Sequence, residues 1–148
     1  ELAGVAGRRR IPLAQFYRDD GMDHLTLSDG ELLIAVHLPF PPDYIATGYA
    51  KSRIRGSIDF PLAGVAVRLG VIDSKIKDLR VGLTGVSPLP FLSNGLDKFL
   101  GNEVDKKFLE SLRDHVRAQA KAMKTSMTPP HYRRRVAGGL AQKIAEAI

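Results

Sequence analysis

Three strand patterns follow one another in the middle of the chain, and they limit the folds open to it. The strands are expected at Thr47–Arg55, Leu62–Leu69 and Ile76–Val86, where apolar and polar residues alternate or small apolar residues form a run. The stretch Gly70–Lys75 has the composition of a hairpin loop between the last two. Consecutive strands with short links predict an antiparallel meander.

Helical patterns follow the strands. A short helix is expected over Ser93–Gly101, capped by Ser93, and a longer one over Asn102 to about Lys124, capped by Asn102. Thr128-Pro129 should open a last helix. The expected buried stripes are Val104, Phe108, Leu112 and Val116 in the longer helix, and Tyr132, Val136, Leu140 and Ile144 in the last. These patterns predict an α+β fold, with an antiparallel sheet of about three strands followed by about three helices.

Two glycines fall inside the last helical pattern, at Gly138 and Gly139. Each costs about 1 kcal/mol relative to alanine in a helix interior. We therefore expect another backbone to approach the helix closely at this point.

The first 40 residues precede a proline-rich bend. Glu31–Pro39 reads as a strand that is apolar on both faces, which predicts that both faces are covered. Pro39, Pro41 and Pro42 then interrupt the pattern. We place a boundary there, between a unit of residues 1–40 and a unit of residues 41–148.

Composition narrows the class of protein. The 148 residues carry a net charge of +6 and a pI of ≈ 9.8, which raises the prior for an anionic partner. There is no cysteine, and there is no apolar run of about 18 residues. We therefore expect no membrane span and no signal peptide, and a cytoplasmic location fits the lack of cysteine.

Catalytic and metal-binding motifs are missing from the sequence. The four histidines have no metal-ligand spacing, and no nucleophile elbow, Walker motif or Rossmann fingerprint occurs. We expect His37 in a core or subunit contact and His115 in solvent. Arg133-Arg134-Arg135 spreads around a helix and should be a solvated helix start with subunit contacts, which argues against a nucleic-acid partner.

The stretch Tyr49–Asp59 carries the most distinctive charge pattern. Lys51, Arg53 and Arg55 share one strand face with Tyr49, and three cations on one face are costly to bury without anions. Residue chemistry alone favours a solvated, charged edge strand.

The order of these motifs resembles the FAD-binding (medium or beta) subunit of the molybdenum hydroxylase family. The resemblance rests on the following stretches: Arg9–Pro12 with Phe16-Tyr17, Gly30–Pro39, Tyr49–Arg55 with Asp59, Val81–Val86 with Pro88, and Tyr132–Arg134. Phe16–Met22 is most similar to the beta subunit of 4-hydroxybenzoyl-CoA reductase. The resemblance covers only the C-terminal part of such a subunit. It implies that residues 1–40 are the last strands of an FAD-binding subdomain and that 41–148 form the C-terminal α+β domain.

The resemblance implies a part in an oxidoreductase. It implies FAD in the full subunit, molybdopterin and [2Fe–2S] partner subunits, and a dimer of heterotrimers that removes a phenolic hydroxyl reductively. It implies that Leu33 packs on the flavin ring and that Lys51 lies close to it, where a fixed cation would stabilise the anionic reduced flavin. Arg55 and Asp59 are expected to form a structural pair. No catalytic or metal residue is expected, and the chain alone should be inactive and bind no FAD stably.

Two alternatives stay open. The first is the same family with another substrate, such as carbon monoxide, an aldehyde or a purine. The second is a basic binding or scaffold domain without a redox role.

Overall fold

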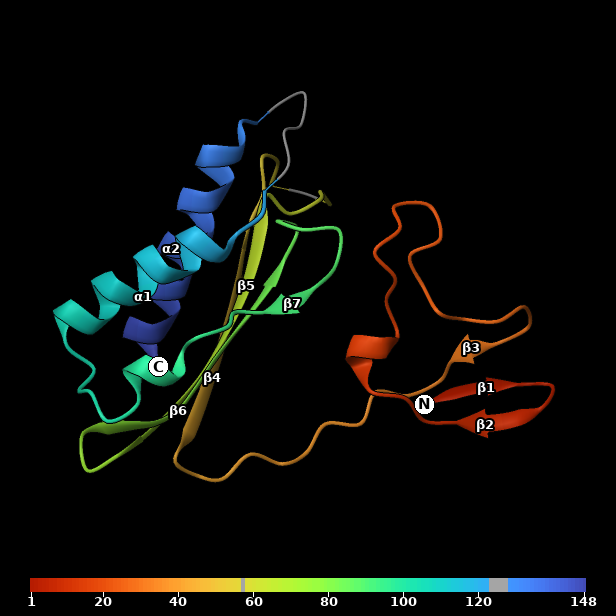
Figure 1. Ribbon diagram of the computed structural model, residues 1–148, viewed down its shortest axis with the longest axis horizontal. Helices are drawn as coiled ribbons and strands as arrows, with labels where there is room; N and C mark the ends of the chain where they lie inside the picture. The colour runs from red at the N-terminus through yellow and green to blue at the C-terminus, as the bar shows by residue number, and fades with distance from the viewer. Residues whose placement is uncertain (57, 123–127) are drawn as a thin grey trace. The chain divides into compact units, whose positions relative to one another are not determined.

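The computed structural model describes residues 1–56, 58–122 and 128–148, which divide into two compact units. The first unit is Glu1–Pro41 and the second is Pro42–Ile148 (Figure 1). The division falls within the proline-rich bend.

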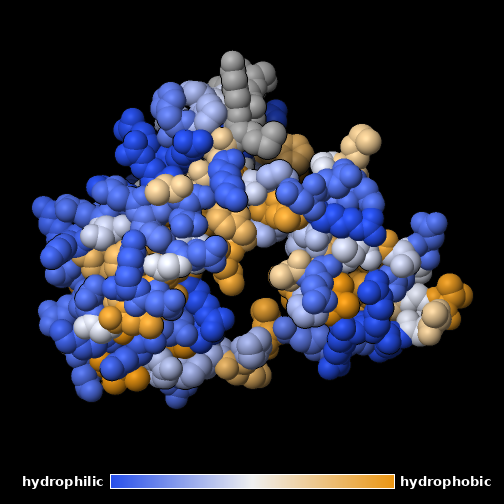
Figure 2. All heavy atoms as spheres, viewed as in Figure 1, coloured by the Kyte–Doolittle hydropathy of each residue, from blue (hydrophilic) through white to orange (hydrophobic). Residues whose placement is uncertain are grey.

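The first unit is a small antiparallel sheet with loops. Its strands are β1 (Leu2–Gly4), β2 (Gly7–Arg9) and β3 (Leu32–Leu33), in the order β2-β1-β3, and Leu13–Gln15 forms a 3-10 turn. The strand expected over Glu31–Pro39 is therefore reduced to two residues, and the prediction that both its faces are covered is wrong. Its apolar side chains are exposed because no second layer covers this sheet within the described unit; they are Leu32, Leu33, Ile34, Val36 and Leu38. Apolar atoms accordingly reach the surface in Figure 2.

The second unit contains a four-stranded antiparallel sheet in the order β4-β5-β6-β7. The strands are β4 (Ile45–Ser52), β5 (Ala63–Ile72), β6 (Lys75–Thr84) and β7 (Phe91–Leu92). The predicted meander is confirmed for the first three strands. The fourth was missed, because Phe91-Leu92 is too short to show an alternating pattern.

A two-residue turn joins β5 to β6. Asp73 and Ser74 both have positive φ values, 50° and 60°, as a type I′ hairpin turn requires. Aspartate tolerates this region better than most residues. The hairpin is thus tighter than the loop expected over Gly70–Lys75.

Two α-helices, α1 (Lys106–Gln119) and α2 (Pro130–Ala147), lie on one side of the sheet (Figure 1). The short helix expected over Ser93–Gly101 is only a 3-10 turn, Asp97–Phe99. Its N-cap is Leu96 instead of Ser93. The N-cap of α1 is Asp105, not Asn102; its carboxylate accepts a hydrogen bond from the Phe108 amide at 2.7 Å. A carboxylate at this position satisfies a free amide of the first turn. Helix α1 ends at Gln119, and the expected end near Lys124 lies outside the described residues.

The core of the second unit lies between the sheet and the helices. It combines alternate residues of β5 and β6 with Phe108, Leu112 and Val116 of α1, as the helical pattern predicts. Val104, also expected in this stripe, precedes α1 and is exposed. Of the stripe expected for α2, Ile144 is buried and Val136 and Leu140 pack against the core, but Tyr132 is 47% exposed. The most deeply buried side chains of this helix, Ala137 and Ala141, lie one residue further along. Small side chains form the buried face of α2 because this helix packs against both α1 and the sheet.

Gly138 lies at a close approach of the two helices. A Cβ added to it would lie 2.5 Å from the carbonyl oxygen of Arg113 in α1, so the predicted backbone contact is confirmed at this residue. A Cβ added to Gly139 would meet no atom within 4 Å, so the same prediction is wrong there.

The two glycines predict opposite responses to alanine. We expect Gly138→Ala to lower the free energy of unfolding by about 1–3 kcal/mol, because the new methyl group forces the helices apart. Gly139→Ala is the matched control and should raise it by up to about 1 kcal/mol through helix propensity. Urea unfolding of both variants measures the two changes. Equal effects of the two substitutions would contradict the close-approach interpretation.

Candidate functional site

The face of the sheet that the helices leave uncovered carries Lys51. On β4, Tyr49 and Lys51 are exposed, whereas Ala50 between them packs against the core. Strand alternation is thereby confirmed for this segment. Lys51 stands in a cross-strand row with Gly64 of β5 and Thr84 of β6, at the end of the sheet opposite the β5–β6 turn.

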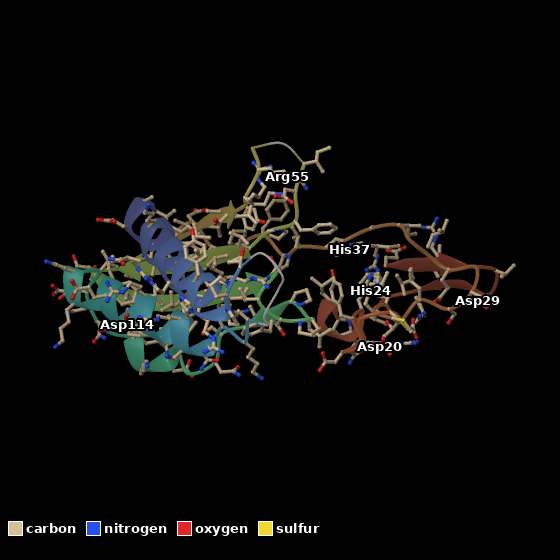
Figure 3. The ribbon with its side chains drawn as sticks, turned by 90° about the horizontal axis from the view of Figure 1, so that it is seen from above. Asp20, His24, Asp29, His37, Arg55 and Asp114 are labelled. Carbon is tan, nitrogen blue, oxygen red and sulfur yellow. The ribbon has the colours of Figure 1, made fainter. Side chains whose placement is uncertain are left out.

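Strand β4 ends before the remaining cations of the pattern. It stops at Ser52, so the strand expected to reach Arg55 is three residues too long. The loop beyond it is held by Asp59, which accepts hydrogen bonds from the amide of Arg55 at 3.1 Å and from its guanidinium at 3.2 Å (Figure 3 labels Arg55). The Arg55 guanidinium lowers the pKa of Asp59. The expected structural pair is confirmed, and the loop takes Arg55 out of the strand on which Lys51 lies.

Leu33, the other predicted cofactor neighbour, lies on β3 of the first unit. Its side chain is half-exposed and lines a cavity of about 250 Å³. The remaining lining includes Ile11, Leu13, Phe16 and Val36, so the cavity wall is largely apolar. An apolar wall of this kind suits the flat face of an aromatic ring better than a charged group.

Charged side chains rim this cavity. The Glu1 carboxylate lies 2.8 Å from Nε2 of His37 and accepts a hydrogen bond from Arg10 at 3.0 Å. His37 and Arg10 lower the pKa of Glu1. His37 is half-exposed beside Glu1 (Figure 3), so it does not lie in a core, because the strand that would have buried it is not formed here; a subunit contact stays a prediction.

A second ion pair fastens β2 to the segment before β3. Arg9 donates two hydrogen bonds to the Glu31 carboxylate, both at 2.7 Å. With the Ser28 amide, which donates to the same carboxylate at 2.8 Å, they lower the pKa of Glu31 to about 2. The pair holds Glu31, the residue before β3, against β2, and Leu33 follows two residues later.

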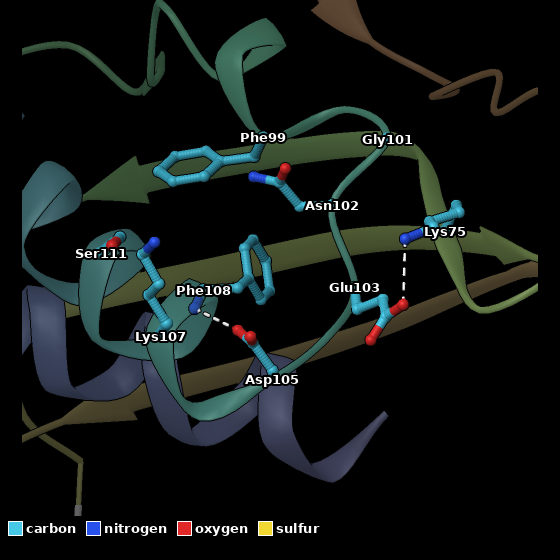
Figure 4. Close-up of a pocket in the computed structure, with 9 residues that line it drawn as sticks. All are labelled: Lys75, Phe99, Gly101, Asn102, Glu103, Asp105, Lys107, Phe108 and Ser111. Atoms are coloured by element: carbon cyan, nitrogen blue, oxygen red, sulfur yellow. Dashed lines mark hydrogen bonds and ion pairs between the residues drawn. The ribbon is translucent and has the colours of Figure 1, made fainter.

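Another surface pocket, of about 270 Å³, lies at the start of α1 (Figure 4). Lys75 and Glu103 form an ion pair across it at 2.9 Å, and Asp105 is occupied as the helix cap. Three of the charged side chains that line it, those of Lys75, Glu103 and Asp105, thus have partners within the chain. We assign no function to it.

Neither a metal-binding cluster nor a membrane-spanning helix is found among the described residues. No group of three or more histidine and carboxylate side chains could hold a metal ion there. Within the same ranges, no helix is long and apolar enough to cross a bilayer.

Arg133 is the residue whose position the charge pattern misjudged. It was expected in solvent, yet only 9% of it is exposed. Its Nε donates to the Leu62 carbonyl at 2.9 Å and its Nη2 to the Gly85 carbonyl. Helical periodicity could have found it, because Arg133 precedes the buried Ala137 and Ala141 at intervals of four residues.

Comparison with protein families then identifies the second unit. The model of the "CO dehydrogenase flavoprotein C-terminal domain" matches residues 48–148. The chain belongs to this family. The matched range contains Lys51 and Arg133, whereas Leu33 lies before it.

Relatives of the family match both units. The carbon monoxide dehydrogenase medium chain of Afipia carboxidovorans is 29% identical over 148 residues, 99% of this chain and 50% of the relative. The glyceraldehyde dehydrogenase medium chain of Sulfolobus acidocaldarius is 24% identical, over 99% of this chain and 51% of the relative. A solved structure of the Cu,Mo-CO dehydrogenase in its cyanide-inactivated form matches with a TM-score of 0.84 and 27% identity, over 98% of this chain and 50% of the other. The chain therefore spans about half the length of the relatives it matches.

The Arg9–Glu31 pair gives a pH-dependent prediction. Arg9→Ala should raise the pKa of Glu31 from about 2 toward its ordinary 4.5, because the two strongest hydrogen bonds to the carboxylate are lost. A lowered carboxyl pKa stabilises the fold above pH 4.5, and this contribution disappears as the pH falls through about 2. The difference in stability between the parent and Arg9→Ala should follow the same course.

NMR titration of the Glu31 carboxyl carbon measures the shift. Arg8→Ala is the control, since Arg8 is an exposed arginine of the same strand that pairs with Glu1 instead. A pKa for Glu31 that is equal in the parent and in Arg9→Ala would contradict the assignment.

Proposed function

We propose that this chain is the C-terminal half of the FAD-containing medium subunit of a molybdenum hydroxylase-type oxidoreductase. The observation that carries the proposal is Lys51, a cation exposed on the uncovered face of the sheet within the family's own domain. The medium chains of the relatives, of which this chain spans about half, support the same reading.

The burial of the first unit supports the domain assignment. Among its apolar side chains only Leu2 and Phe16 are buried, while the large apolar side chains of β3 and of the residues after it are exposed. Units of about 40 residues bury too little surface to be stable unaided. In this proposal residues 1–40 are the last strands of an FAD-binding subdomain, and their exposed apolar side chains pack against its remainder.

Leu33 and Lys51 have the chemistry that a flavin site needs, an apolar contact for the ring and a fixed cation for its charge. When bound, FAD supplies a centre that exchanges electrons between a two-electron partner and one-electron clusters. Lys51 contributes a positive charge that favours the negative charge gained on reduction, which raises the reduction potential. Leu33 contributes an apolar surface that excludes water. The two residues lie in different units, so each is tested separately.

The substrate reaction belongs to partner subunits in this proposal. A molybdopterin subunit binds and converts the substrate, and a [2Fe–2S] subunit transfers electrons to or from the flavin. The complex is a dimer of heterotrimers. We propose 4-hydroxybenzoyl-CoA as substrate, on the likeness of Phe16–Met22 to that reductase. Carbon monoxide and aldehydes are the second candidates, because the matched medium chains carry the names of enzymes for such substrates.

The visible spectrum of the complex tests the proposal. The complete gene is expressed with its partner subunits, and we expect flavin absorption that is bleached by the correct substrate or electron donor. A purified complex without flavin would overturn the redox assignment. Flavin reduction by carbon monoxide or an aldehyde, but no turnover with 4-hydroxybenzoyl-CoA, would keep the family role and replace the substrate.

Lys51 gives the sharpest single-residue prediction. Lys51→Ala in the complete complex should lower the flavin reduction potential or weaken FAD retention, because a fixed positive charge beside the ring is lost. Redox titration and flavin content after gel filtration measure the two effects. Lys77→Ala is the control, since Lys77 is an exposed lysine at the opposite end of the same sheet. An unchanged potential with unchanged flavin content would refute the role of Lys51.

A further inference from the structure

Arg133 reaches from the first turn of α2 to the end of the sheet that carries Lys51. Its Nε donates to the Leu62 carbonyl at 2.9 Å, and the Leu62 amide in turn donates to the Ser52 carbonyl at 2.8 Å. Ser52 follows Lys51 directly and closes β4. Two hydrogen bonds in series therefore join the guanidinium to the residue beside Lys51.

The second arm of the guanidinium fixes the neighbouring strand end. Its Nη2 donates to the carbonyl of Gly85, which follows Thr84 at the end of β6. Gly85 has a φ of +72°, and a Cβ there would lie 3.0 Å from the Pro61 carbonyl oxygen. Glycine allows this turn and this contact together. Thr84 stands in the row Thr84–Gly64–Lys51, so Nη2 of Arg133 binds at the end of the sheet at which Lys51 lies.

An arginine suits this position for a geometric reason. Its planar fork presents several N–H donors in fixed directions, and it can hold two carbonyl groups from different segments at once. Lysine has a single ammonium on a flexible stem and cannot reproduce both directions. Arg133 is buried, so these bonds are shielded from water and from salt.

We infer that Arg133 is a positioning residue for Lys51: it ties α2 to the ends of β4, β5 and β6 and so fixes the backbone from which the Lys51 side chain extends on the uncovered sheet face. The inference rests on the proposed flavin role of Lys51. A charge tunes a bound group only when its position is fixed, because a mobile ammonium is replaced by reorganising water.

The test uses the complete flavoprotein complex and measures two quantities other than turnover. In Arg133→Ala we expect the flavin potential to fall in the same direction as in Lys51→Ala, and the Leu62 amide to exchange with solvent faster. Arg133→Lys should give an intermediate potential. Arg135→Ala is the matched control, an exposed arginine two positions along the same helix, and should leave both quantities at the parent values.

A double variant separates positioning from direct charge. If Arg133 acts through Lys51, Arg133→Ala should cause little further fall in potential when Lys51 is already alanine. An equal fall in both backgrounds, or full restoration by Arg133→Lys, would overturn the inference by showing a direct effect of charge. If Arg133→Ala does not fold, the lysine variant alone and combined with Lys51→Ala answers the same question.

The proposed function and this inference fail in different ways. A parent complex without flavin, or a flavin potential that is the same in the parent and in Lys51→Ala, contradicts the proposed role of Lys51. A flavin potential that falls in Lys51→Ala but is unchanged in both Arg133 variants contradicts only the positioning role of Arg133.

Discussion

One face of the four-stranded sheet is buried under α1 and α2, and the arrangement of the second unit depends on this one-sided burial. Alternate residues of β5 and β6, such as Val65, Val67 and Val81, are fully buried against the helices. The intervening residues must then face away from the core, because successive side chains of a strand point to opposite sides. The exposure of Tyr49 and Lys51 on β4 is a consequence of the same constraint.

The small residues of α2 set how the helices meet the sheet. Gly138 lets this helix approach the backbone of α1, and Ala137 and Ala141 are fully buried on the same helix. That close packing brings Arg133, one turn earlier, under the ends of the strands, where carbonyl groups receive its hydrogen bonds. A buried cation is tolerated there because its polar hydrogens meet oxygen acceptors.

The first unit differs, since its short strands are joined by backbone pairing and few of its apolar side chains are buried. Two clusters of ion pairs add to this pairing: Arg9 with Glu31, and Glu1 with Arg10 and His37. Exposed ion pairs contribute little stability each. A unit of this kind is suited to pack against further protein, in keeping with the proposed place of the chain in a longer flavoprotein subunit.

The sequence by itself determined the three consecutive strands and the stripe of Phe108, Leu112 and Val116 in α1, because these follow from local periodicity, and the Arg55–Asp59 pair, whose partners are close along the chain. The cost of glycine in a helix indicated a close contact at Gly138-Gly139, but the tertiary structure decided that Gly138 makes it, with Arg113 of α1. Only the tertiary structure decided that Phe91-Leu92 pairs as a fourth strand, that β3 is short and exposed, and that Arg133 is buried. These depend on partners distant in sequence: β6 supplies the edge for β7, and Leu62 and Gly85 supply the acceptors that make burial of a guanidinium favourable. The flavin roles of Leu33 and Lys51 stay predictions, since a cofactor contact is a property of the bound state.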